Sequence, residues 1–526
     1  MKKLYHNGTV LTMAQERTAE AVLTQNGVIL AVGKKEDISA MAGNAQWEDL
    51  EGRTLMPAFI DAHSHLTSYA NSFLQADLEG SADFGELADR IKRFISENGI
   101  RPGEWVIASG YDNNTLKEKR HPLLRVLDES SPQNPLVLNH ASGHAGVFNS
   151  LALEKLGVTP ETSSPEGGRI GRENGTLTGY MEENAFFTYL KKVPSPDFSA
   201  LAEAYMKAQR SYASFGIATV QEGMMVKQMI PMHRMLRDTG RLFLDCVAYA
   251  APLDAEEITQ AFPDAVKRYD GNYKIGGYKI FLDGSPQART AWMREPYVNG
   301  EPGYRGYGTM KDEEVLSAFL KACENKMQLL AHCNGDAAAQ QYIDAAQRAG
   351  GKADVSRIRP VMIHAQLLGQ DQLSAVKGLG IIPSFFVAHV YHWGDTHVIN
   401  FGEQRASKIS PAASAKKQDI PFTFHQDAPV IAPNMLETVW CAANRVTKAG
   451  RLLGQDERIS VYDALKAVTV NAAYQYFEED KKGSIEPGKN ADFVMLDKNP
   501  LDVPAEQIRD IRVIKTIKRD KCIFGC

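Results

Sequence analysis

Two histidines separated by a single residue, His63 and His65, stand at the end of an apolar stretch that covers residues 56–62. Side chains of a strand alternate between its two faces, so residues i and i+2 project from the same face. Two imidazoles placed side by side form half of a typical zinc site. We therefore interpret His63 and His65 as the first ligands of a predicted metal site.

Further residues of the ligand-forming types lie at or near the ends of other predicted strands. Barrel enzymes carry their chemistry at the carboxyl ends of the strands, so these side chains would converge there. Four imidazoles, one carboxylate and one lysine could hold one or two divalent metal ions, with zinc as the expected metal. The additional candidates are Lys279, His332, His364 and Asp427.

The elements that must position these residues are short apolar runs, which alternate with helical stretches from about residue 200 onward. This alternation predicts a parallel α/β sheet. Eight such runs match the strand number of a closed (β/α)8 TIM barrel. The expected strands are 58–65, 217–221, 244–249, 277–282, 328–332, 360–364, 381–386 and 421–427.

Both ends of the chain have a sequence pattern typical of β-strands. Apolar residues alternate with polar ones or are β-branched, and Asn26-Gly27 is a hairpin signal. We expect residues 1–56 and 481–526 to form one small β-sandwich, because the ends of a domain often lie close together. The barrel would then comprise residues 57–480. Residues 67–200 are too many for one crossover, so they predict an inserted subdomain after the first barrel strand.

Composition narrows the class of protein. The chain has 526 residues and a formal net charge of -5, which provides no basic field for nucleic acid. No apolar run reaches the roughly 18 residues of a membrane span. Six scattered cysteines without a CxxC pair favour reduced thiols and a cytoplasmic protein. The expected partner is a small-molecule substrate, and the sequence is compatible with a homodimer.

With these motifs in order along nearly its whole length, the sequence resembles the amidohydrolase superfamily, and within it the YtcJ-like branch called amidohydrolase family 3. The matching segments lie along the predicted barrel, in the insertion and in the C-terminal part of the predicted β-sandwich. They are Met-Pro-Ala-Phe-Ile-Asp-Ala-His-Ser-His (56–65), Ser-Gly-His-Ala-Gly-Val-Phe-Asn-Ser (142–150), Tyr-Lys-Ile-Phe-Leu-Asp-Gly-Ser (278–285), His-Cys-Asn-Gly-Asp (332–336), Ile-His-Ala-Gln (363–366), His-Gln-Asp-Ala-Pro-Val (425–430) and Gly-Ser-Ile-Glu-Pro-Gly-Lys-Asn-Ala-Asp-Phe (483–493).

The resemblance implies a metal-dependent amidohydrolase that cleaves a non-peptide carbon–nitrogen bond of a small molecule with a metal-activated hydroxide. It implies that His63 and His65 bind the more buried metal and that His332 and His364 bind the second. Asp427 would ligate a metal and relay the proton of the hydroxide. Lys279 would be carboxylated and bridge both metals, which requires a neutral amine and so a lowered pKa. Otherwise Lys279 stays unmodified, and a glutamate of the insertion, Glu182 or Glu183, is the bridge.

Three histidines are predicted to serve the substrate. His144 matches a family position and would donate a hydrogen bond to the scissile carbonyl. His389 belongs to a predicted loop, 387–397, that is rich in histidine and aromatic residues. Strand alternation places His425 on the same face as Asp427, so this imidazole would enter the barrel where the family commonly has a small residue.

Two other readings remain open from the sequence. A mononuclear deaminase or an esterase-type hydrolase on the same barrel would use His63, His65, His332 and Asp427 and leave Lys279 unmodified. A non-catalytic homologue would keep the fold without turnover. The number of metal ions per chain separates the mononuclear enzyme from a two-metal enzyme. Metal-dependent turnover would exclude the non-catalytic homologue.

Overall fold

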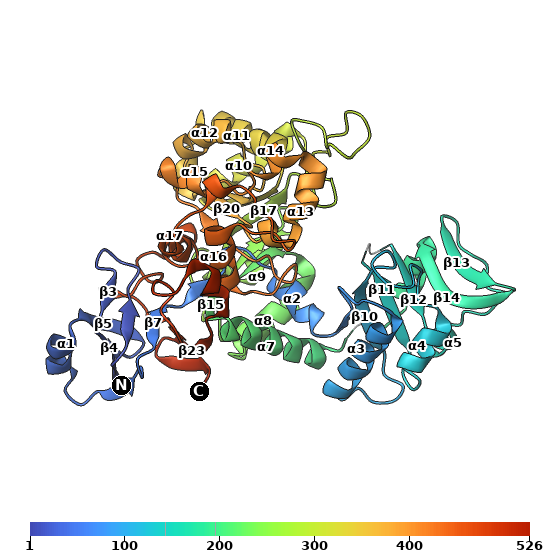
Figure 1. Cartoon of the computed structure of the whole chain (residues 1–526), viewed down its shortest axis with the longest axis horizontal. Coiled ribbons are helices and arrows are strands. Elements are labelled where there is room, and N and C mark those ends of the chain that lie inside the picture. The colour runs from blue at the N-terminus through green and yellow to red at the C-terminus, as the bar shows by residue number, and fades with distance from the viewer. Residues whose placement is uncertain (142–143, 195) are drawn as a thin grey trace. The chain divides into compact units, whose positions relative to one another are not determined.

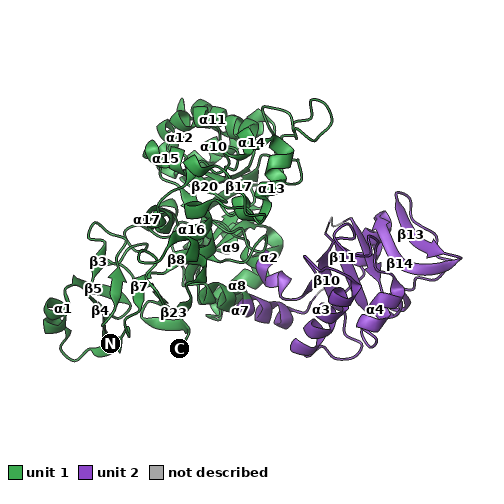
Figure 2. Cartoon of the chain, in the orientation of Figure 1, with its two compact units in different colours: residues 1–67, 208–526 green, residues 68–207 purple. Residues whose placement is uncertain are grey.

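The computed structural model describes residues 1–141, 144–194 and 196–526. The chain forms two compact units, coloured green and purple in Figure 2. Unit 1 comprises Met1–Thr67 and Ala208–Cys526, and unit 2 comprises Ser68–Lys207. Ser142 and Gly143, which open the predicted motif 142–150, lie outside the described residues.

A parallel sheet, of which β15, β17 and β20 are labelled in Figure 1, forms the centre of unit 1. Within the described residues its order is β21-β20-β19-β18-β17-β16-β15-β8. Neighbouring strands pair in parallel throughout. The central strands are buried on both faces, as parallel sheets require. The strands are β8 (Phe59–Ile60), β15 (Ile217–Met225), β16 (Asp245–Ala250), β17 (Tyr273–Phe281), β18 (Gln328–Cys333), β19 (Val361–His364), β20 (Ile382–Phe385) and β21 (Thr423–Phe424).

Side chains from strands distant in this order pack into one buried cluster. Ile60 of β8 belongs to it together with Val247 of β16, Leu330 of β18 and Ile382 of β20. The segments that follow the two outermost strands are also joined by backbone hydrogen bonds. The amide of Asp427 donates to the carbonyl of His63 (3.2 Å), and the amide of His65 donates to Ala428 (2.9 Å).

Each of the eight predicted barrel strands overlaps an observed strand, so the predicted parallel α/β sheet is confirmed. The first and the last strand are much shorter than predicted, since β8 ends at Ile60 and β21 ends at Phe424. His63, His65 and Asp427 therefore lie just beyond the strands. A positive φ of 55° at Asp427 is incompatible with a strand that continues through this residue.

Helices of unit 1 follow most of these strands. The α-helices are α1 (Lys35–Ala42), α8 (Ile230–Asp238), α9 (Ala255–Ala261), α10 (Asp312–Asn325), α11 (Asp336–Gly350), α12 (Leu373–Gly378), α13 (His389–Phe401), α14 (Glu403–Ala406), α15 (Ala412–Lys417), α16 (Met435–Asn444), α17 (Val461–Ala467) and α18 (Val470–Gln475). Short 3₁₀ turns are η1 (Lys227–Met229), η2 (Pro263–Ala265), η3 (Val355–Ile358), η4 (Gln370–Gln372), η5 (Gln455–Glu457) and η6 (Ala505–Asp510). Helices α2 (Leu66–Ser72) and α7 (Phe198–Ser214) contain the two boundaries between the units.

The prediction of a loop at 387–397 is wrong, because most of this segment belongs to helix α13. Its buried positions are spaced three or four residues apart, at Val390, Gly394, His397 and Phe401, which is the period of an amphipathic helix. Gly394 is accommodated for a packing reason, since an added Cβ would lie 2.7 Å from the side chain of Thr447.

The two ends of the chain share one sheet, in the order β24-β23-β22-β7-β2-β3. Strand β7 (Thr54–Pro57) pairs with β22 (Phe493–Leu496) in antiparallel fashion and so joins them. The other members are β2 (Thr9–Leu11), β3 (Thr18–Ala19), β23 (Val513–Lys518) and β24 (Lys521–Phe524). A second terminal sheet, in the order β5-β4-β1-β6, contains β1 (Lys2–His6), β4 (Ala21–Gln25), β5 (Val28–Gly33) and β6 (Gln46–Asp49).

The hairpin predicted at Asn26-Gly27 is confirmed. Strands β4 and β5 are antiparallel on either side of these two residues. Both residues have positive φ, 54° for Asn26 and 82° for Gly27, as the two-residue turns of tight hairpins require.

The expectation that all six cysteines are reduced thiols is wrong for two of them. Cys522 and Cys526 are paired in a disulfide on and after β24, whereas Cys246, Cys323, Cys333 and Cys441 are free. The sequence analysis considered only CxxC spacing, and this pair has a separation of four residues. One argument for a cytoplasmic protein is thereby removed.

Unit 2 contains a sheet in the order β13-β14-β12-β11-β10-β9. Its strands are β9 (Ala76–Asp77), β10 (Val106–Tyr111), β11 (Leu136–His140), β12 (Ala145–Phe148), β13 (Gly168–Glu173) and β14 (Thr176–Glu183). Its helices are α3 (Phe84–Glu97), α4 (Leu124–Ser130), α5 (Ser150–Lys155) and α6 (Asn184–Leu190). The unit has apolar clusters of its own, one with Leu87 and Leu138 and the other with Phe148 and Phe186.

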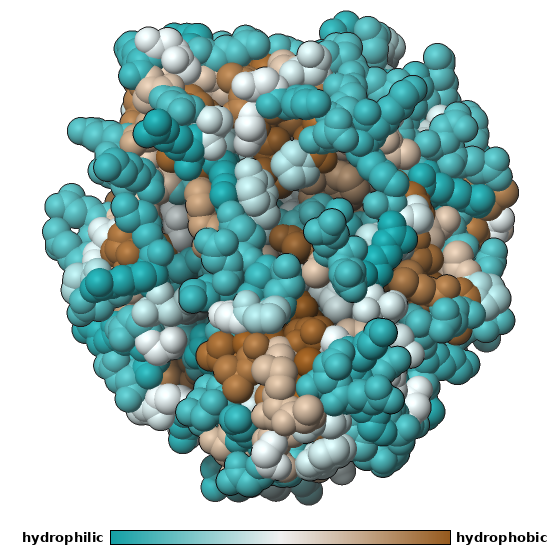
Figure 3. Space-filling view, turned by 90° about the vertical axis from the view of Figure 1, so that its left-hand side faces the viewer, coloured by the Kyte–Doolittle hydropathy of each residue, from teal (hydrophilic) through white to brown (hydrophobic). Residues whose placement is uncertain are grey.

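Polar side chains cover most of the face drawn in Figure 3, and apolar side chains form separate patches on it. Across the described part of the chain, no helix has the length and apolar character needed to cross a membrane.

Candidate metal centre

The predicted ligands of unit 1 converge beyond the carboxyl ends of the parallel strands. One ligand atom from each of His63, His65 and Asp427 lies within 4.8 Å of the others, as in a site that could hold a metal ion. The Nε2 atoms of both histidines are 3.5 Å from Oδ1 of Asp427. Residues from the first and the last strand connections therefore meet at one point.

The short segment that carries the two histidines is held by backbone hydrogen bonds from both sides. The amide of Asp61 donates to Thr219, and the amide of Gly223 donates to Ser64. Gly223 leaves room for both imidazoles, because a Cβ at this position would lie 2.7 Å from His63 and 2.9 Å from His65. The end of β15 thus forms a close-fitting support for the histidine pair.

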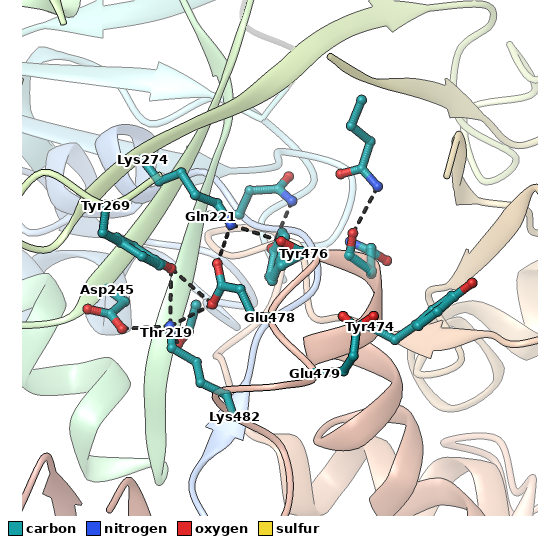
Figure 4. Close-up of polar contacts among 12 residues, drawn as sticks. Thr219, Gln221, Asp245, Tyr269, Lys274, Tyr474, Tyr476, Glu478, Glu479 and Lys482 are labelled. Atoms are coloured by element: carbon teal, nitrogen blue, oxygen red, sulfur yellow. Dashed lines mark hydrogen bonds and ion pairs between the residues drawn. The ribbon is translucent and has the colours of Figure 1, made fainter. Parts of the chain in front are cut away.

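His63 is oriented by Gln221, a buried residue of β15. The amide group of Gln221 donates to the carbonyl of Ala62 (2.8 Å) and to the hydroxyl of Tyr476 (2.9 Å), a contact drawn in Figure 4. Its carbonyl oxygen therefore accepts the third hydrogen bond, from Nδ1 of His63 at 2.5 Å. This arrangement selects the tautomer of His63 whose Nε2 carries the free lone pair and faces Lys279 and Asp427.

Lys279 of β17 is fully buried beside these ligands, with its Nζ 3.2 Å from Nε2 of His63. Burial lowers the pKa of Lys279 to about 7, although the negative charge of Asp427 acts in the opposite direction. Burial also raises the pKa of Asp427 to about 7, against the influence of Lys279. The lysine thus meets the requirement for a lowered pKa that carboxylation imposes.

A second line of histidines adjoins the first group. Nε2 of His364 lies 3.1 Å from Nδ1 of His332, and Nδ1 of His364 lies 3.1 Å from Nε2 of His425. The far nitrogen of His425 is 2.9 Å from the hydroxyl of Ser384 on β20. His425 is fully buried, and Ser384 and His364 occupy its two ring nitrogens.

Burial keeps these imidazoles neutral at physiological pH. It lowers the pKa of His65 and of His332 to about 3, with a further contribution from the positive charge of Lys279. Burial also holds the pKa of His63, His364 and His425 well below the usual value. Neutral imidazoles offer the lone pairs that metal ligation requires.

These donors fit a divalent cation on electrostatic grounds. Among the described residues, Asp427 Oδ1 is buried and has no hydrogen-bond partner. Leaving such an atom unpaired costs about 1–3 kcal/mol, and more when the group is charged. Nitrogen and carboxylate oxygen around one point form the donor set that zinc prefers. His63, His65 and Asp427 are therefore suited to hold a metal ion together.

The other predicted site residues are His389 of unit 1 and His144 of unit 2. His389 begins helix α13, is buried, and places its Nδ1 3.1 Å from Nε2 of His397. Its ring packs against Phe386, which also contacts His425. His144 belongs to unit 2, where its exposed ring lies 3.1 Å from a carboxylate oxygen of Glu183.

The sequence analysis missed the residues that orient the ligands, namely Gln221, Gly223 and Ser384. The sequence contains a weak signal for two of them, because Gln221 ends the predicted strand 217–221 and Gly223 follows two residues later. Ser384 lies within the predicted strand 381–386 without any distinguishing feature.

A parallel α/β sheet with histidines and an aspartate gathered beyond its strands is the arrangement of metal-dependent hydrolases. The family model described as "Amidohydrolase family" matches residues 46–524. The chain belongs to this family, as the motifs predicted, and it is a hydrolase of carbon–nitrogen bonds that depends on a divalent metal.

Individual relatives agree with this assignment. The N-substituted formamide deformylase of Arthrobacter pascens is 28% identical, with 97% of this chain and 96% of the relative covered. The putative amidohydrolase YtcJ of Bacillus subtilis is 26% identical, with 100% and 99% covered. Among solved structures, an uncharacterized metal-dependent hydrolase from Pyrococcus horikoshii is 26% identical with a TM-score of 0.78, over 96% of this chain and 99% of that chain.

Proposed function

We propose that the protein hydrolyses the carbon–nitrogen bond of a small N-acyl compound, with N-substituted formamides as the first substrate class to test. The convergence of His63, His65 and Asp427 beside Lys279 is the observation that carries this proposal. The substrate class comes from the relative named as an N-substituted formamide deformylase, which aligns with 97% of the chain.

His63, His65 and Asp427 would hold one divalent metal ion, for which zinc is our proposal, and His332 and His364 would hold a second. A divalent metal bound there lowers the pKa of a water molecule and polarises the substrate carbonyl. Lys279 would bridge the two positions after its neutral Nζ attacks carbon dioxide and loses a proton to form a carbamate. The lowered pKa of Lys279 supports this modification.

Asp427 is proposed to move the proton of the reaction. It takes a proton from the attacking water as the oxygen bonds to the carbonyl carbon, and delivers it to the nitrogen as the carbon–nitrogen bond breaks. Its Oδ1, which faces His63 and His65, would bind the metal ion, so Oδ2 is the oxygen proposed for this transfer. For an N-substituted formamide, the products are formate and an amine.

The three histidines predicted to serve the substrate receive different roles. Because Ser384 and His364 occupy both nitrogens of His425, we propose that His425 positions His364, while contact with substrate remains the alternative. His389 and His144 stay predicted substrate residues. A mononuclear enzyme with an unmodified Lys279 also stays a candidate, because the three ligands that meet most closely suffice for one ion.

We further propose that the parallel sheet closes as a (β/α)8 barrel covering residues 57–480, with an insertion at 67–200. The shared cluster of Ile60 with Leu330 and Ile382 supports closure. Residues 1–56 and 481–526 would form the β-sandwich, which the pairing of β7 with β22 supports. A cytoplasmic location and a homodimer stay predictions.

The test is hydrolysis by zinc-loaded enzyme of a panel that contains N-alkyl formamides, longer N-acyl amines, esters and cyclic amides, followed by detection of the released acid and amine. We expect turnover of an N-acyl compound that a chelator abolishes and added zinc restores. Asp427→Asn should lower kcat by about 10²–10⁴-fold, the usual range for loss of a general acid–base group. Asp419→Asn, which changes an exposed aspartate, is the matched control. Turnover that is insensitive to the chelator would contradict the proposal.

A further inference from the structure

A cavity of unit 1 opens at the amino end of β18. Its volume is about 230 Å³. Gln328 is one of its wall residues and the first residue of β18, whereas His332 stands four residues farther along the same strand. At about 3.3 Å per residue, the cavity wall and the candidate ligand are roughly 13 Å apart. The cavity is therefore separate from the metal centre, at the end of the strands where barrel enzymes do not carry their chemistry.

The charged residues that line this cavity are all cationic. Its lining residues are Tyr249, Lys267, Lys274, Gly276, Lys326, Gln328, Arg357, Tyr476 and Phe477, a set with four cations and no carboxylate. A concave surface lined by charges of one sign concentrates ligands of the opposite sign. This is notable in a chain whose formal net charge is -5.

The four cations are not equivalent. Lys274 is buried, and its ammonium group pairs with Glu478 and donates a hydrogen bond to the carbonyl of Tyr476, as Figure 4 shows. Arg357 pairs with Asp354 at 3.0 Å. Lys267 and Lys326 are exposed, and the described residues provide no ion-pair partner for either one. Two ammonium groups at the rim are therefore available to an anion.

The same cavity has aromatic walls. Tyr249 and Tyr476 are buried within it, whereas Phe477 remains 48% exposed. Phe477 is fixed by Arg359, whose guanidinium lies 4.3 Å from its ring centroid, 3.7 Å from that of Tyr474, and is bound to Glu479. A large apolar side chain held in place at the mouth of a cavity is a typical feature of a ligand site.

We propose that this cavity, defined by Lys267, Lys326 and Phe477, binds a small aromatic carboxylate. The rim ammonium groups receive the carboxylate, and the ring of the ligand lies against the exposed ring of Phe477. Pockets for drug-sized ligands have volumes of about 300–1,000 Å³. A cavity of about 230 Å³ therefore selects a ligand with a single ring.

Titration calorimetry of the metal-loaded enzyme with benzoate tests this site, because benzoate combines one carboxylate with one ring. We expect saturable binding of one benzoate per chain, with weaker binding of inorganic phosphate, which lacks the ring, and of benzyl alcohol, which lacks the charge. The double variant Lys267→Gln/Lys326→Gln should raise the Kd of benzoate about tenfold, since it removes two partly exposed charge contacts. Lys408→Gln, which changes an exposed lysine outside the cavity, should leave the Kd within about twofold.

The variant Asp427→Ala distinguishes binding of benzoate in the cavity from binding of benzoate at the metal centre. This variant should bind benzoate with unchanged affinity, because Asp427 does not line the cavity. Absence of saturable binding by the wild-type enzyme, an unchanged Kd in the double lysine variant, or loss of binding in Asp427→Ala would each overturn the proposal. Phosphate binding as tight as that of benzoate would overturn the aromatic class of the ligand.

Discussion

The carboxamide oxygen of Gln221 accepts a hydrogen bond from Nδ1 of His63 at 2.5 Å. This contact fixes both the tautomer and the ring orientation of the first candidate ligand. Gln221→Leu should therefore weaken zinc binding by about 10–100-fold, the range usual for loss of a residue that orients a metal ligand. Gln221→Glu keeps the acceptor and should recover part of the affinity. Competition with a chromophoric chelator measures both values.

The matched control for this variant is Gln475→Leu. Gln475 is also buried and donates to the carbonyl of Ala62, but its carbonyl oxygen accepts from Thr423 and not from a histidine. We expect its zinc affinity to stay within about threefold of the wild-type value. Equal losses in the two variants would mean that Gln221 acts only through packing.

Lys279 is the residue that we propose to set the number of metal ions per chain. If its carbamate bridges two ions, Lys279→Met should reduce the zinc content from two ions per chain to one, because methionine supplies no bridging oxygen. Elemental analysis after exhaustive dialysis measures the content. Wild-type enzyme incubated with ¹³C-labelled bicarbonate should also show a carbamate carbon resonance that is missing in the variant. One zinc ion per chain in both proteins would instead support the mononuclear enzyme.

Substitution of His425 tests whether this residue positions His364 or contacts the substrate. His425→Phe keeps an aromatic ring at this position but removes the hydrogen bonds to His364 and Ser384. The positioning role predicts that the second zinc ion binds about 10–100-fold more weakly, whereas KM measured at saturating zinc is unchanged. A raised KM with unchanged zinc affinity would assign His425 to the substrate. Ser384→Ala, which removes only the outer hydrogen bond, should show a smaller loss in the same direction.

The pH dependence of stability should reflect Asp245, a buried carboxylate of β16. Its oxygens lie 2.6 Å from the ammonium groups of Lys482 and Lys518 and 3.2 Å from Arg519. Burial by itself raises the pKa of Asp245, but these cations together outweigh it and hold the pKa below the usual range. A lowered folded-state pKa stabilises the protein above the unfolded-state pKa of about 3.9, and this stabilisation is lost as the pH falls further.

Asp245→Asn should accordingly lower the free energy of unfolding at pH 7 by about 3–5 kcal/mol, because it leaves buried cations without their partner. The difference from the wild-type protein should shrink between pH 4 and pH 3, and urea unfolding at both values and at pH 7 measures it. Asp497→Asn is the control, since Asp497 pairs with the exposed Arg512 and should cost less than about 1 kcal/mol. A constant difference across this pH range would contradict the assignment.

The sequence revealed the candidate ligands more readily than the residues that orient them. His63, His65 and Asp427 could be predicted because their residue types are uncommon at strand ends and their motifs match a family. Gln221 could not, since a buried glutamine has many uses and its partner lies 158 residues away along the chain. Hydrogen-bond partners that come from different strands become visible only once the sheet is assembled.

The fold shows the same division. Short apolar runs that alternate with helical stretches predicted each strand of the parallel sheet, because a strand buried in such a sheet requires apolar residues. Strand ends were less predictable, since β8 and β21 stop where the backbone bends to present His63 and Asp427. Helix α13 was mistaken for a loop because its histidines and aromatic residues concealed the spacing of Val390, His397 and Phe401.

The central claim is that His63, His65 and Asp427 bind one metal ion together. The most direct measurement is a crystal structure of the zinc-loaded protein with anomalous diffraction recorded on both sides of the zinc absorption edge. Our account predicts a zinc peak about 2.0–2.2 Å from the imidazole nitrogens and from Oδ1 of Asp427. A protein that retains its fold and contains zinc, but has no anomalous peak between these three residues, would contradict it.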